Sequence, residues 1–239
     1  MRKTACVTGA ASGLGYSLAE ALVKKGYLVF AGYHTRLKPD LARLGEAYPE
    51  QVVIGRLDIS DLESVKAFKS VILSKTDHLD LMLNNAGILG VYDQTIFDDI
   101  DYDSIRHVIE TNTFGPLRTI NQYLDLILKS EDKLIINISS TDASIADCWR
   151  KDSFAYCISK AGLNVMTAIV ANGLSDYGVK VLAIHPGWLR TYMCGEIDAE
   201  ADMEPEEAAE KIMKLIDRKD EFPFTPLNYI DNNGNPMRY

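Results

Sequence analysis

Tyr156 and Lys160 lie four positions apart, in the segment Tyr-Cys-Ile-Ser-Lys, and could together exchange a proton with a substrate. Residues i and i+4 share one face of a helix, so the phenol and the ammonium point into one region. A free phenol has a pKa of about 10 and is a weak acid-base group at neutral pH. A neighbouring cation stabilises the phenolate and lowers that pKa, which suits proton exchange with an alcohol or a ketone.

A second segment with chemical potential is the glycine-rich run Thr8-Gly9-Ala10-Ala11-Ser12-Gly13-Leu14-Gly15. Residues without a Cβ atom let the backbone turn tightly and approach a pyrophosphate. The helix expected after this run would offer free N–H groups and the positive end of its dipole. The spacing differs from the G-x-G-x-x-G fingerprint, but the run predicts dinucleotide binding by Gly9, Ser12, Gly13, Leu14 and Gly15.

The elements that must position these residues alternate along the chain. Short apolar runs predict strands at 4–8, 28–33, 52–57, 79–83, 133–138 and 179–184, with an edge strand within 223–230. Longer amphipathic stretches predict helices at about 14–25, 60–74, 102–129, 153–175 and 204–216. Ser60-Asp61-Leu62-Glu63 has the form of a capping box, which places the start of the second of these helices at Ser60.

Strands that alternate with helices predict a parallel sheet, and continuous apolar runs indicate that helices cover both of its faces. Right-handed crossovers then give an α/β fold, a single-domain Rossmann-type doubly wound parallel sheet of about seven strands. The sequence contains no composition break or linker, so we expect one domain over residues 1–239. A loop around 188–204 follows a predicted strand end and is the expected substrate lid.

Composition excludes several other functions. The formal net charge of −9 disfavours nucleic acid as a partner. The four cysteines form no C-x-x-C pair, which argues against a metal site and favours reduced thiols in the cytoplasm. No stretch approaches the ~18 consecutive apolar residues that indicate a membrane span. We therefore expect a cytoplasmic protein with no metal, membrane or nucleic-acid partner.

Taken in order, the motifs resemble those of the short-chain dehydrogenase/reductase family. They are the glycine run, Asn84-Asn85-Ala86-Gly87, Ser139-Ser140, Tyr156 with Lys160, and Pro186-Gly187. Gly115-Pro116-Leu117, His185-Pro186-Gly187-Trp188 and a short Tyr/Asn/Gly-rich tail are similar to those of sniffer-like carbonyl reductases and C-factor relatives. The resemblance covers nearly the whole chain.

The resemblance implies a catalytic set of Asn112, Ser140, Tyr156 and Lys160. Ser140 lies sixteen residues before Tyr156, a longer separation than is usual in the family. An insertion within 141–153 accounts for it, but Ser144, twelve residues before Tyr156, remains an alternative. Pro116 has no N–H, so in one continuous helix the carbonyl of Asn112 would lack its partner. In the family that carbonyl and an ordered water relay protons toward the lysine.

The resemblance also implies where a nicotinamide cofactor binds. Beyond the glycine run and the Tyr156/Lys160 pair, the implied contacts are Tyr33, His34, Arg36, Asp58, Ile59, Asn85, Ala86, Gly87, Pro186, Gly187 and Thr191. An acidic residue at the end of the second strand would select NAD. Here that end reads Tyr33-His34-Thr35-Arg36, so NADP(H) is favoured, since Arg36 and His34 could meet the 2′-phosphate. NAD(H) stays possible.

These expectations combine into a function. We expect an NAD(P)(H)-dependent oxidoreductase that reduces a ketone or aldehyde, with Tyr156 as acid, Ser140 orienting the carbonyl, and Lys160 binding ribose and lowering the tyrosine pKa. The alternatives are a non-catalytic dinucleotide sensor, and an isomerase or dehydratase on the same scaffold. A homodimer or homotetramer is possible through the helix at 102–129.

Overall fold

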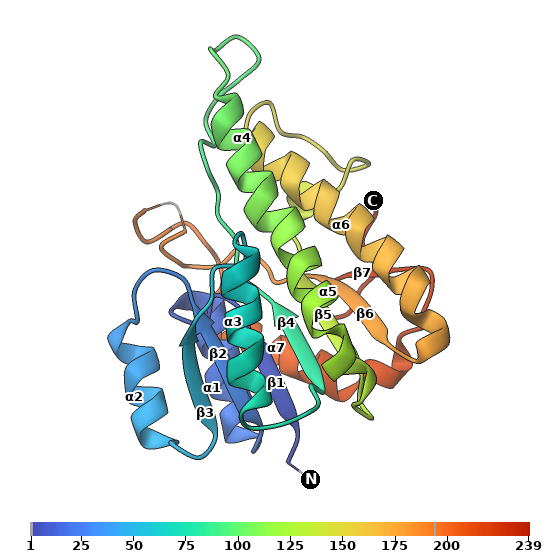
Figure 1. Cartoon of the computed structure of the whole chain (residues 1–239). Coiled ribbons are helices and arrows are strands. Elements are labelled where there is room, and N and C mark those ends of the chain that lie inside the picture. The colour runs from blue at the N-terminus through green and yellow to red at the C-terminus, as the bar shows by residue number, and fades with distance from the viewer. Residues whose placement is uncertain (1, 194) are drawn as a thin grey trace.

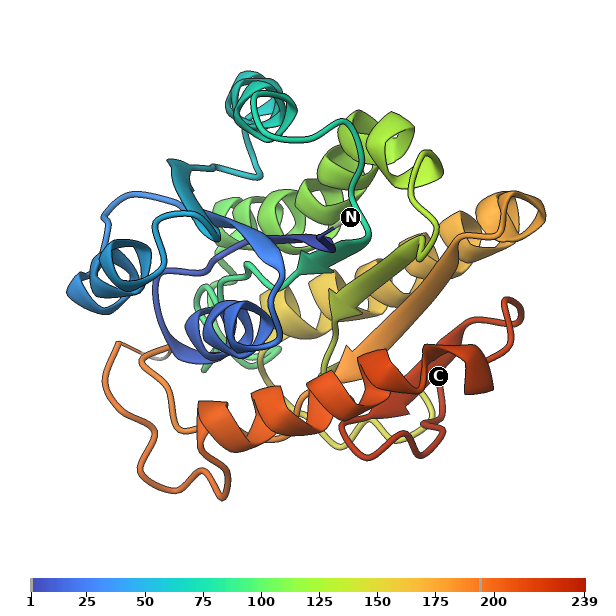
Figure 2. The ribbon, with the colours of Figure 1, turned by 90° about the horizontal axis from the view of Figure 1, so that it is seen from below.

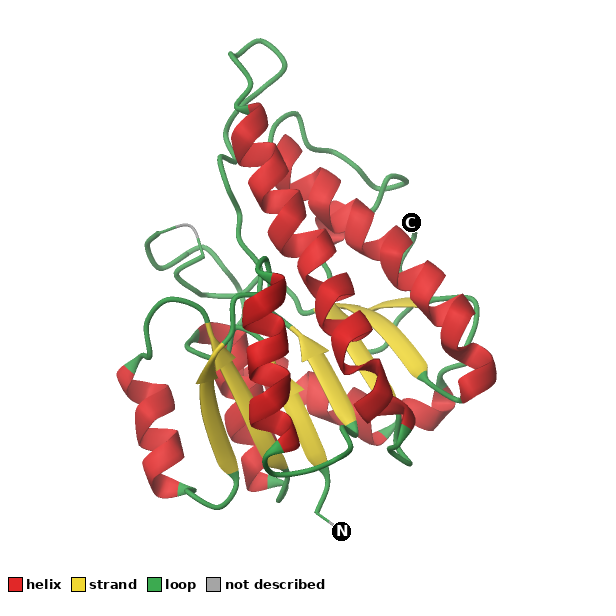
Figure 3. Cartoon of the chain, viewed as in Figure 1, coloured by secondary structure: helices red, strands yellow, loops and turns green. Residues whose placement is uncertain are grey.

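The computed structural model describes residues 2–193 and 195–239 and contains one seven-stranded parallel sheet (Figures 1 and 3). Its order is β3-β2-β1-β4-β5-β6-β7, and every neighbouring pair is parallel. The strands are β1 (Thr4–Val7), β2 (Leu28–Tyr33), β3 (Val52–Arg56), β4 (Leu81–Asn84), β5 (Leu134–Ile138), β6 (Lys180–His185) and β7 (Asn228–Asp231). The predicted doubly wound α/β fold is confirmed.

Helices cover both faces of the sheet, as the continuous apolar strands predict (Figure 2). One face packs against α1 (Gly13–Lys24), α2 (Pro39–Ala47) and α7 (Pro205–Asp217). The other packs against α3 (Leu62–Leu73), α5 (Gly115–Leu128) and α6 (Phe154–Leu174). The α4 helix (Tyr102–Ile109) precedes α5 and packs on α6 above the sheet (Figure 1).

A chain of buried polar side chains crosses from α5 to α6 through the two central strands. Thr119 Oγ1 donates to Asn84 Oδ1 (2.7 Å), and Asn84 Nδ2 donates to Asn137 Oδ1 (2.8 Å). Asn137 Nδ2 donates in turn to Thr167 Oγ1 (2.8 Å). Asn84 and Asn137 are register partners on β4 and β5, and all four side chains are buried. Each buried amide therefore has a partner, as buried polar groups require.

Two local features differ from the sequence expectations. The α2 helix was not predicted; it begins at Pro39 and buries only Leu41 and Leu44. The predicted capping box at Ser60 is wrong, because Asp61 is the N-cap of α3 and its side chain accepts the Glu63 N–H. Ser60 instead donates its N–H and hydroxyl to Asp58.

The long helix expected over 102–129 is interrupted by one π-helical turn at Glu110–Phe114. The Gly115 N–H bonds the carbonyl of Glu110, five residues back. Pro116, which has no N–H, follows directly, so the wider turn joins α4 to α5 in one continuous helical run. Such turns are found at functional sites, and this one contains Asn112.

One segment, Phe154–Tyr177, which contains α6, is long and apolar enough to cross a membrane by length and composition alone, although it is not a run of consecutive apolar residues. About 44% of that window is buried inside the protein. Its inner face holds Ser159, Lys160 and Leu163 against the sheet and its neighbours, as a core helix does.

Candidate active site

The expected functional residues meet at the carboxyl edge of the sheet, where β1 and β4 are neighbours although they are not consecutive. The glycine run follows β1, Asn85 follows β4, Ser140 lies just beyond β5, and Pro186 follows β6. These four strands are adjacent in that order. In open α/β sheets the carboxyl ends at such a reversal of strand order are where ligands bind.

The glycine turn is so tight that no side chain fits inside it. Gly9 and Gly13 have positive φ angles of +68° and +55°. A Cβ atom on Gly15 would lie 2.2 Å from the Gly9 carbonyl oxygen, far inside contact distance. The side chain of Leu14 is buried in the core, so this residue can offer a ligand its backbone only.

Thr8 fastens this turn to the loop after β4, a role that the sequence did not reveal. Its buried Oγ1 accepts the N–H groups of both Asn85 and Ala86, each at 3.0 Å. Asn85 Nδ2 returns hydrogen bonds to the carbonyls of Thr8 (3.0 Å) and Gly9 (3.3 Å). Asn85 therefore positions the glycine turn from the neighbouring strand, and Ala86 packs against Gly9.

The first turn of α1 fits a phosphate group. Its N-cap, Ser12, makes no capping hydrogen bond with its side chain, and the first turn contains no acidic residue. Lys38 folds back from the start of α2 and donates from Nζ to Ser12 Oγ (3.0 Å). The free N–H groups and the helix dipole thus suit a phosphate, and Lys38 adds an ammonium at the Ser12 edge of the turn. Lys38 was missed because the two residues are 26 positions apart.

Beside this turn, His34 and Asp58 lie at the ends of β2 and β3. His34 Nε2 is 3.1 Å from Asp58 Oδ2. Burial raises the pKa of Asp58, but the hydrogen bonds from Ser60 and the nearby His34 ring outweigh burial and hold the pKa below its usual value. Arg36 is exposed and Tyr33 half-buried. The Ile59 side chain faces the core and packs on Gly115, so only its backbone can line a ligand site.

Lys160 is buried beneath the site with a single protein acceptor. Among the described residues its Nζ donates only to the carbonyl of Ile138, at 2.7 Å. Burial lowers the pKa of this ammonium to about 8. An ammonium has three donors, so it keeps capacity for hydroxyl oxygens of a ligand. Gly87 lies beside it, because a Cβ on that glycine would come within 3.8 Å of Nζ.

Tyr156 is half-buried on the first turns of α6, next to Ser140. Burial raises the pKa of its phenol well above the usual value; the charge of Asp142 raises it further, whereas the Ser140 hydroxyl and Arg150 lower it. Lys160 Nζ lies 5.6 Å from the centroid of the tyrosine ring and is turned toward Ile138. The sequence predicts that Lys160 lowers the pKa of Tyr156, but in the structure burial has the largest effect and raises it.

The geometry favours Ser140 over its alternative, Ser144. Ser144 Oγ is engaged within its own loop, where it accepts from the Asp147 N–H (3.0 Å) and donates to that carboxylate (3.3 Å). Ser140 Oγ accepts from the Asp142 N–H (3.1 Å), which leaves its O–H free to donate. The Ser140 carbonyl accepts from the Tyr229 hydroxyl (2.6 Å), so β7 also holds this residue in place.

The Asn112 side chain makes hydrogen bonds to two other segments of the chain. Its Oδ1 accepts from the Ile88 N–H, and its Nδ2 donates to the Ile88 carbonyl, both at 2.8 Å. Nδ2 also donates to Ser159 Oγ (3.0 Å), one residue before Lys160. Asn112 therefore ties the π turn, the loop after β4 and the lysine-bearing turn of α6 together.

The loop after β6 closes the other side of the site. Asn232 Nδ2 donates to the Pro186 carbonyl (2.6 Å), and Gly187 has a φ of +100°. Thr191 reaches the glycine turn, since its Cγ2 lies 3.3 Å from where a Gly13 Cβ would be. Trp188 Nε1 donates to Asp198 Oδ2 (2.7 Å), a hydrogen bond between two residues of the expected lid.

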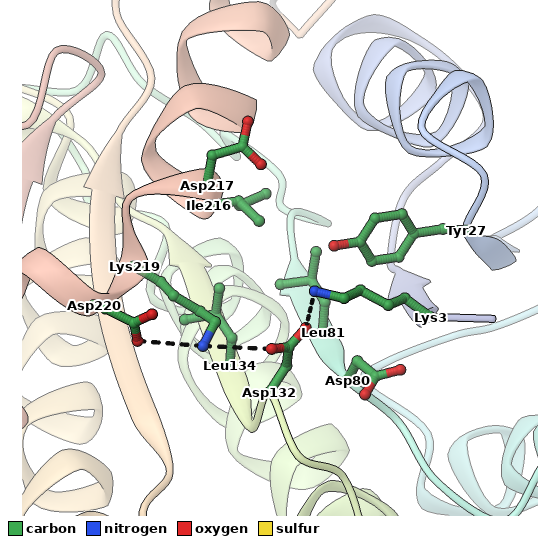
Figure 4. A pocket seen from close by; sticks show the side chains of 10 residues that line it. All are labelled: Lys3, Tyr27, Asp80, Leu81, Asp132, Leu134, Ile216, Asp217, Lys219 and Asp220. Atoms are coloured by element: carbon green, nitrogen blue, oxygen red, sulfur yellow. Dashed lines mark hydrogen bonds and ion pairs between the residues drawn. The ribbon is translucent and has the colours of Figure 1, made fainter. Parts of the chain in front are cut away.

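A cavity of about 220 Å³ lies near the amino ends of the strands, away from this site (Figure 4). Several of its charged residues are paired with one another: Asp132 accepts from Lys3 (2.5 Å) and lies 3.4 Å from Lys219. Asp80 accepts from Thr4 and Ser130. We interpret these contacts as structural, since they join segments near the amino ends of the strands. Over residues 2–193 and 195–239, no group of His, Cys, Asp and Glu side chains is arranged to hold a metal ion.

Comparison with known proteins gives a consistent result. Residues 3–202 match the short chain dehydrogenase family. Estradiol 17-beta-dehydrogenase 2 of Rattus norvegicus is 32% identical over 208 residues, which are 86% of this chain and 53% of that protein. The chain thus spans about half the length of that relative.

Solved structures cover the whole chain. A short-chain dehydrogenase/reductase from Burkholderia multivorans with bound NADP superposes with a TM-score of 0.88 at 28% identity, covering 100% of both chains. The NADPH-bound carbonyl reductase from chicken fatty liver gives 0.87 at 28% identity, also covering 100% of both chains. Carbonyl reductase Sniffer of D. melanogaster gives 0.89 over 100% of both chains, at 22% identity, and supports the fold alone.

Proposed function

Because this chain belongs to the short-chain dehydrogenase family, we propose that it is an NADP(H)-dependent oxidoreductase that reduces a ketone or aldehyde, with Tyr156 as the acid. The observation that carries the proposal is the convergence of Tyr156, Ser140 and Lys160 at the sheet edge beside a glycine turn that no side chain can fill. The carbonyl reductase and the estradiol dehydrogenase among the similar proteins support the same class of reaction.

The residues divide the chemistry as follows. A nicotinamide cofactor, when bound, supplies or accepts the hydride. The Ser140 hydroxyl, with one lone pair occupied by Asp142, donates to the substrate oxygen as charge develops on it. Tyr156 gives that oxygen a proton. Its raised pKa keeps the phenol protonated at neutral pH, which favours reduction there, whereas oxidation would need the phenolate and would gain rate as the pH rises.

Lys160 and Asn112 support that proton transfer. The buried ammonium of Lys160 uses one donor on Ile138, and its remaining donors would hold ribose hydroxyls. Asn112 fixes the turn of α6 that carries the lysine. Asn112 lies in the π turn just before Pro116, which has no N–H, and we infer that its carbonyl binds the water that relays protons to Lys160.

The preference for NADP(H) rests on positive charge near the expected ribose 2′-position. Lys38 reaches Ser12, and Arg36 stays exposed on the adjacent loop. His34, by contrast, is turned toward Asp58, so we assign the phosphate contact to Lys38 and Arg36. Two similar structures contain NADP or NADPH.

Lys38→Met should raise the Kd for NADPH about tenfold, because it removes a charge-assisted hydrogen bond to the ribose 2′-phosphate. The Kd for NADH should stay nearly unchanged, because NADH lacks that phosphate. Fluorescence titration with each cofactor measures the two constants. Lys25→Met is the matched control, since Lys25 lies just beyond the far end of α1 and pairs with Asp217. An equal loss of affinity for both cofactors would contradict the assignment of Lys38.

The proposed function is tested by NADPH oxidation against a panel of ketones and aldehydes, with NADH in parallel. The expected result is carbonyl-dependent oxidation that is faster with NADPH. Cofactor binding without turnover on any carbonyl would favour the sensor alternative. Product formation with no net change in reduced cofactor would favour an isomerase or dehydratase. We also propose a cytoplasmic location, a small-molecule substrate, and a substrate lid at 188–204, of which residue 194 lies outside the described residues.

The exposed face of α6 supports a homodimer. Ile158, Val165 and Ile169 form one apolar stripe on it, and Val165 and Ile169 are 62% and 67% exposed. We expect the wild-type protein to be dimeric and Val165→Glu/Ile169→Glu to be monomeric at tens of micromolar (about 10⁻⁵ M), measured by light scattering after size exclusion. Leu73→Glu, which charges an exposed leucine at the end of α3, should leave the dimer intact. A monomeric wild type would refute this surface.

A further inference from the structure

The loop between β5 and α6 contains an ion pair that is joined to the proposed catalytic serine and acts electrostatically on the proposed catalytic tyrosine. Asp142 Oδ1 accepts from Arg150 Nε and Asp142 Oδ2 from Arg150 Nη2, both at 3.1 Å. The Asp142 side chain is only 10% exposed. Asp142 also donates its N–H to Ser140 Oγ. One residue therefore holds the serine hydroxyl and brings a buried negative charge to the site.

Arg150 is held where it can balance that charge. Its guanidinium lies over the Trp149 ring, 4.6 Å from the centroid, and its Nη1 is 3.9 Å from Asp152. The two parallel hydrogen bonds to Asp142 use the fixed fork of the guanidinium, a geometry that lysine cannot reproduce. Stacking and pairing together fix the position of the positive charge.

The charged and titratable groups around Tyr156 come from several elements. Lys160 and Cys157 lie on α6, and Asp142 and Arg150 on the loop. His185 at the end of β6 and Tyr229 on β7 also interact with Asp142. Burial lowers the pKa of His185, which favours its neutral form. Asp142 is the carboxylate that acts on Tyr156, and Arg150 is its direct counter-ion. Asp152 places a second carboxylate beside Arg150, and Asp202 and Asp231 act on His185.

We propose that Arg150, through its two hydrogen bonds to Asp142, sets the pH at which Tyr156 exchanges its proton, and so acts as a positioning residue for the reaction. The inference rests on the proposed function of Tyr156. In alcohol oxidation the O–H proton passes to the Tyr156 phenolate, while the C–H bond breaks and its hydride goes to NADP⁺. Asp142 is tied to the site through its N–H on Ser140 Oγ. Without Arg150 its negative charge is unbalanced and disfavours the phenolate, which agrees with the opposite effects of the two side chains on the tyrosine.

The decisive experiment is the pH profile of kcat/KM for alcohol oxidation in four variants and one control. Arg150→Met should move the midpoint of the rise up by about one pH unit, and Asp142→Asn should move it down. The double variant should lie near the wild type, because both charges are gone. Arg150→Lys keeps the charge and should move the midpoint by less than half as much as Arg150→Met. Arg218→Met, which removes the arginine of an exposed pair with Glu221, should leave the profile unchanged.

A structural role alone would give a different pattern. If Arg150 only packs the loop, Arg150→Met lowers kcat/KM at every pH with the midpoint in place, and the proposal is overturned. Titration of Cζ-labelled tyrosine by NMR, with Tyr156→Phe to assign the signal, follows the phenol without turnover. If no alcohol is oxidised, the proposed function fails. The effect of the Arg150–Asp142 pair on Tyr156 is then still decided by whether Arg150→Met and Asp142→Asn move that signal in opposite directions.

Discussion

Tyr156→Phe is expected to lower kcat/KM for carbonyl reduction about a thousandfold, within the range of lost general acid–base catalysis, while NADPH binding stays within about twofold. The phenol oxygen is the proton donor next to Ser140, and the phenylalanine ring preserves packing on α6. Because the interaction is made in the transition state, the loss should fall on kcat. Stopped-flow NADPH oxidation and fluorescence titration measure the two quantities.

The matched control for this variant is Tyr177→Phe. Tyr177 is 60% exposed just beyond the end of α6, so removing its hydroxyl should change neither rate nor affinity. A Tyr156→Phe protein that retains more than a tenth of wild-type kcat would show that another group supplies the proton. A variant that loses NADPH affinity and rate together would instead point to a collapsed site.

Gly15→Ala is expected to abolish measurable NADPH binding. The new Cβ would lie 2.2 Å from the Gly9 carbonyl oxygen and 2.5 Å from Asn85 Nδ2. The first of these atoms belongs to backbone that is held from β4, so the turn itself must open. Overpacking of this kind costs about 1–3 kcal/mol of stability, which a thermal melt detects, and the displaced turn no longer fits a pyrophosphate.

Gly173→Ala provides the contrast, because that glycine lies in α6 with no atom within 4 Å of an added Cβ. It should keep full cofactor affinity and stabilise the helix by up to about 1 kcal/mol, the difference in helix propensity between the two residues. Tight NADPH binding by Gly15→Ala would mean that the cofactor does not use this turn.

The sequence predicted the sheet well because its strands are continuous buried runs whose pattern does not depend on distant residues. All seven strands lie within two residues of a predicted run or inside it. The α2 helix escaped prediction because only Leu41 and Leu44 mark its buried side. The π turn was not predicted because apolar periodicity indicates a helix over the whole segment. It does not show that the helix widens for one turn before Pro116.

The site was predictable where a motif fixes backbone position, as at the glycine turn and the Tyr156/Lys160 pair. It was not predictable where long side chains bridge distant segments. Lys38 reaches Ser12 from the N-cap position of α2, and Asp142 meets Arg150 across a loop. Thr8 was visible in the motif, but its two hydrogen bonds to the loop after β4 depend on which strands are neighbours.

The buried chain from Thr119 through Asn84 and Asn137 to Thr167 bears on how the sheet selects its pairing during folding. A slip of one residue between β4 and β5 would turn one of the two asparagines to the opposite face. Its amide would then be buried without a partner, at about 1–3 kcal/mol for each unsatisfied group. Apolar side chains such as Ile135 and Ile136 tolerate exchange far better, since hydrophobic contact is not directional. The amides therefore discriminate against misregistered sheets, and they do so at the two strands whose ends carry Asn85 and Ser140.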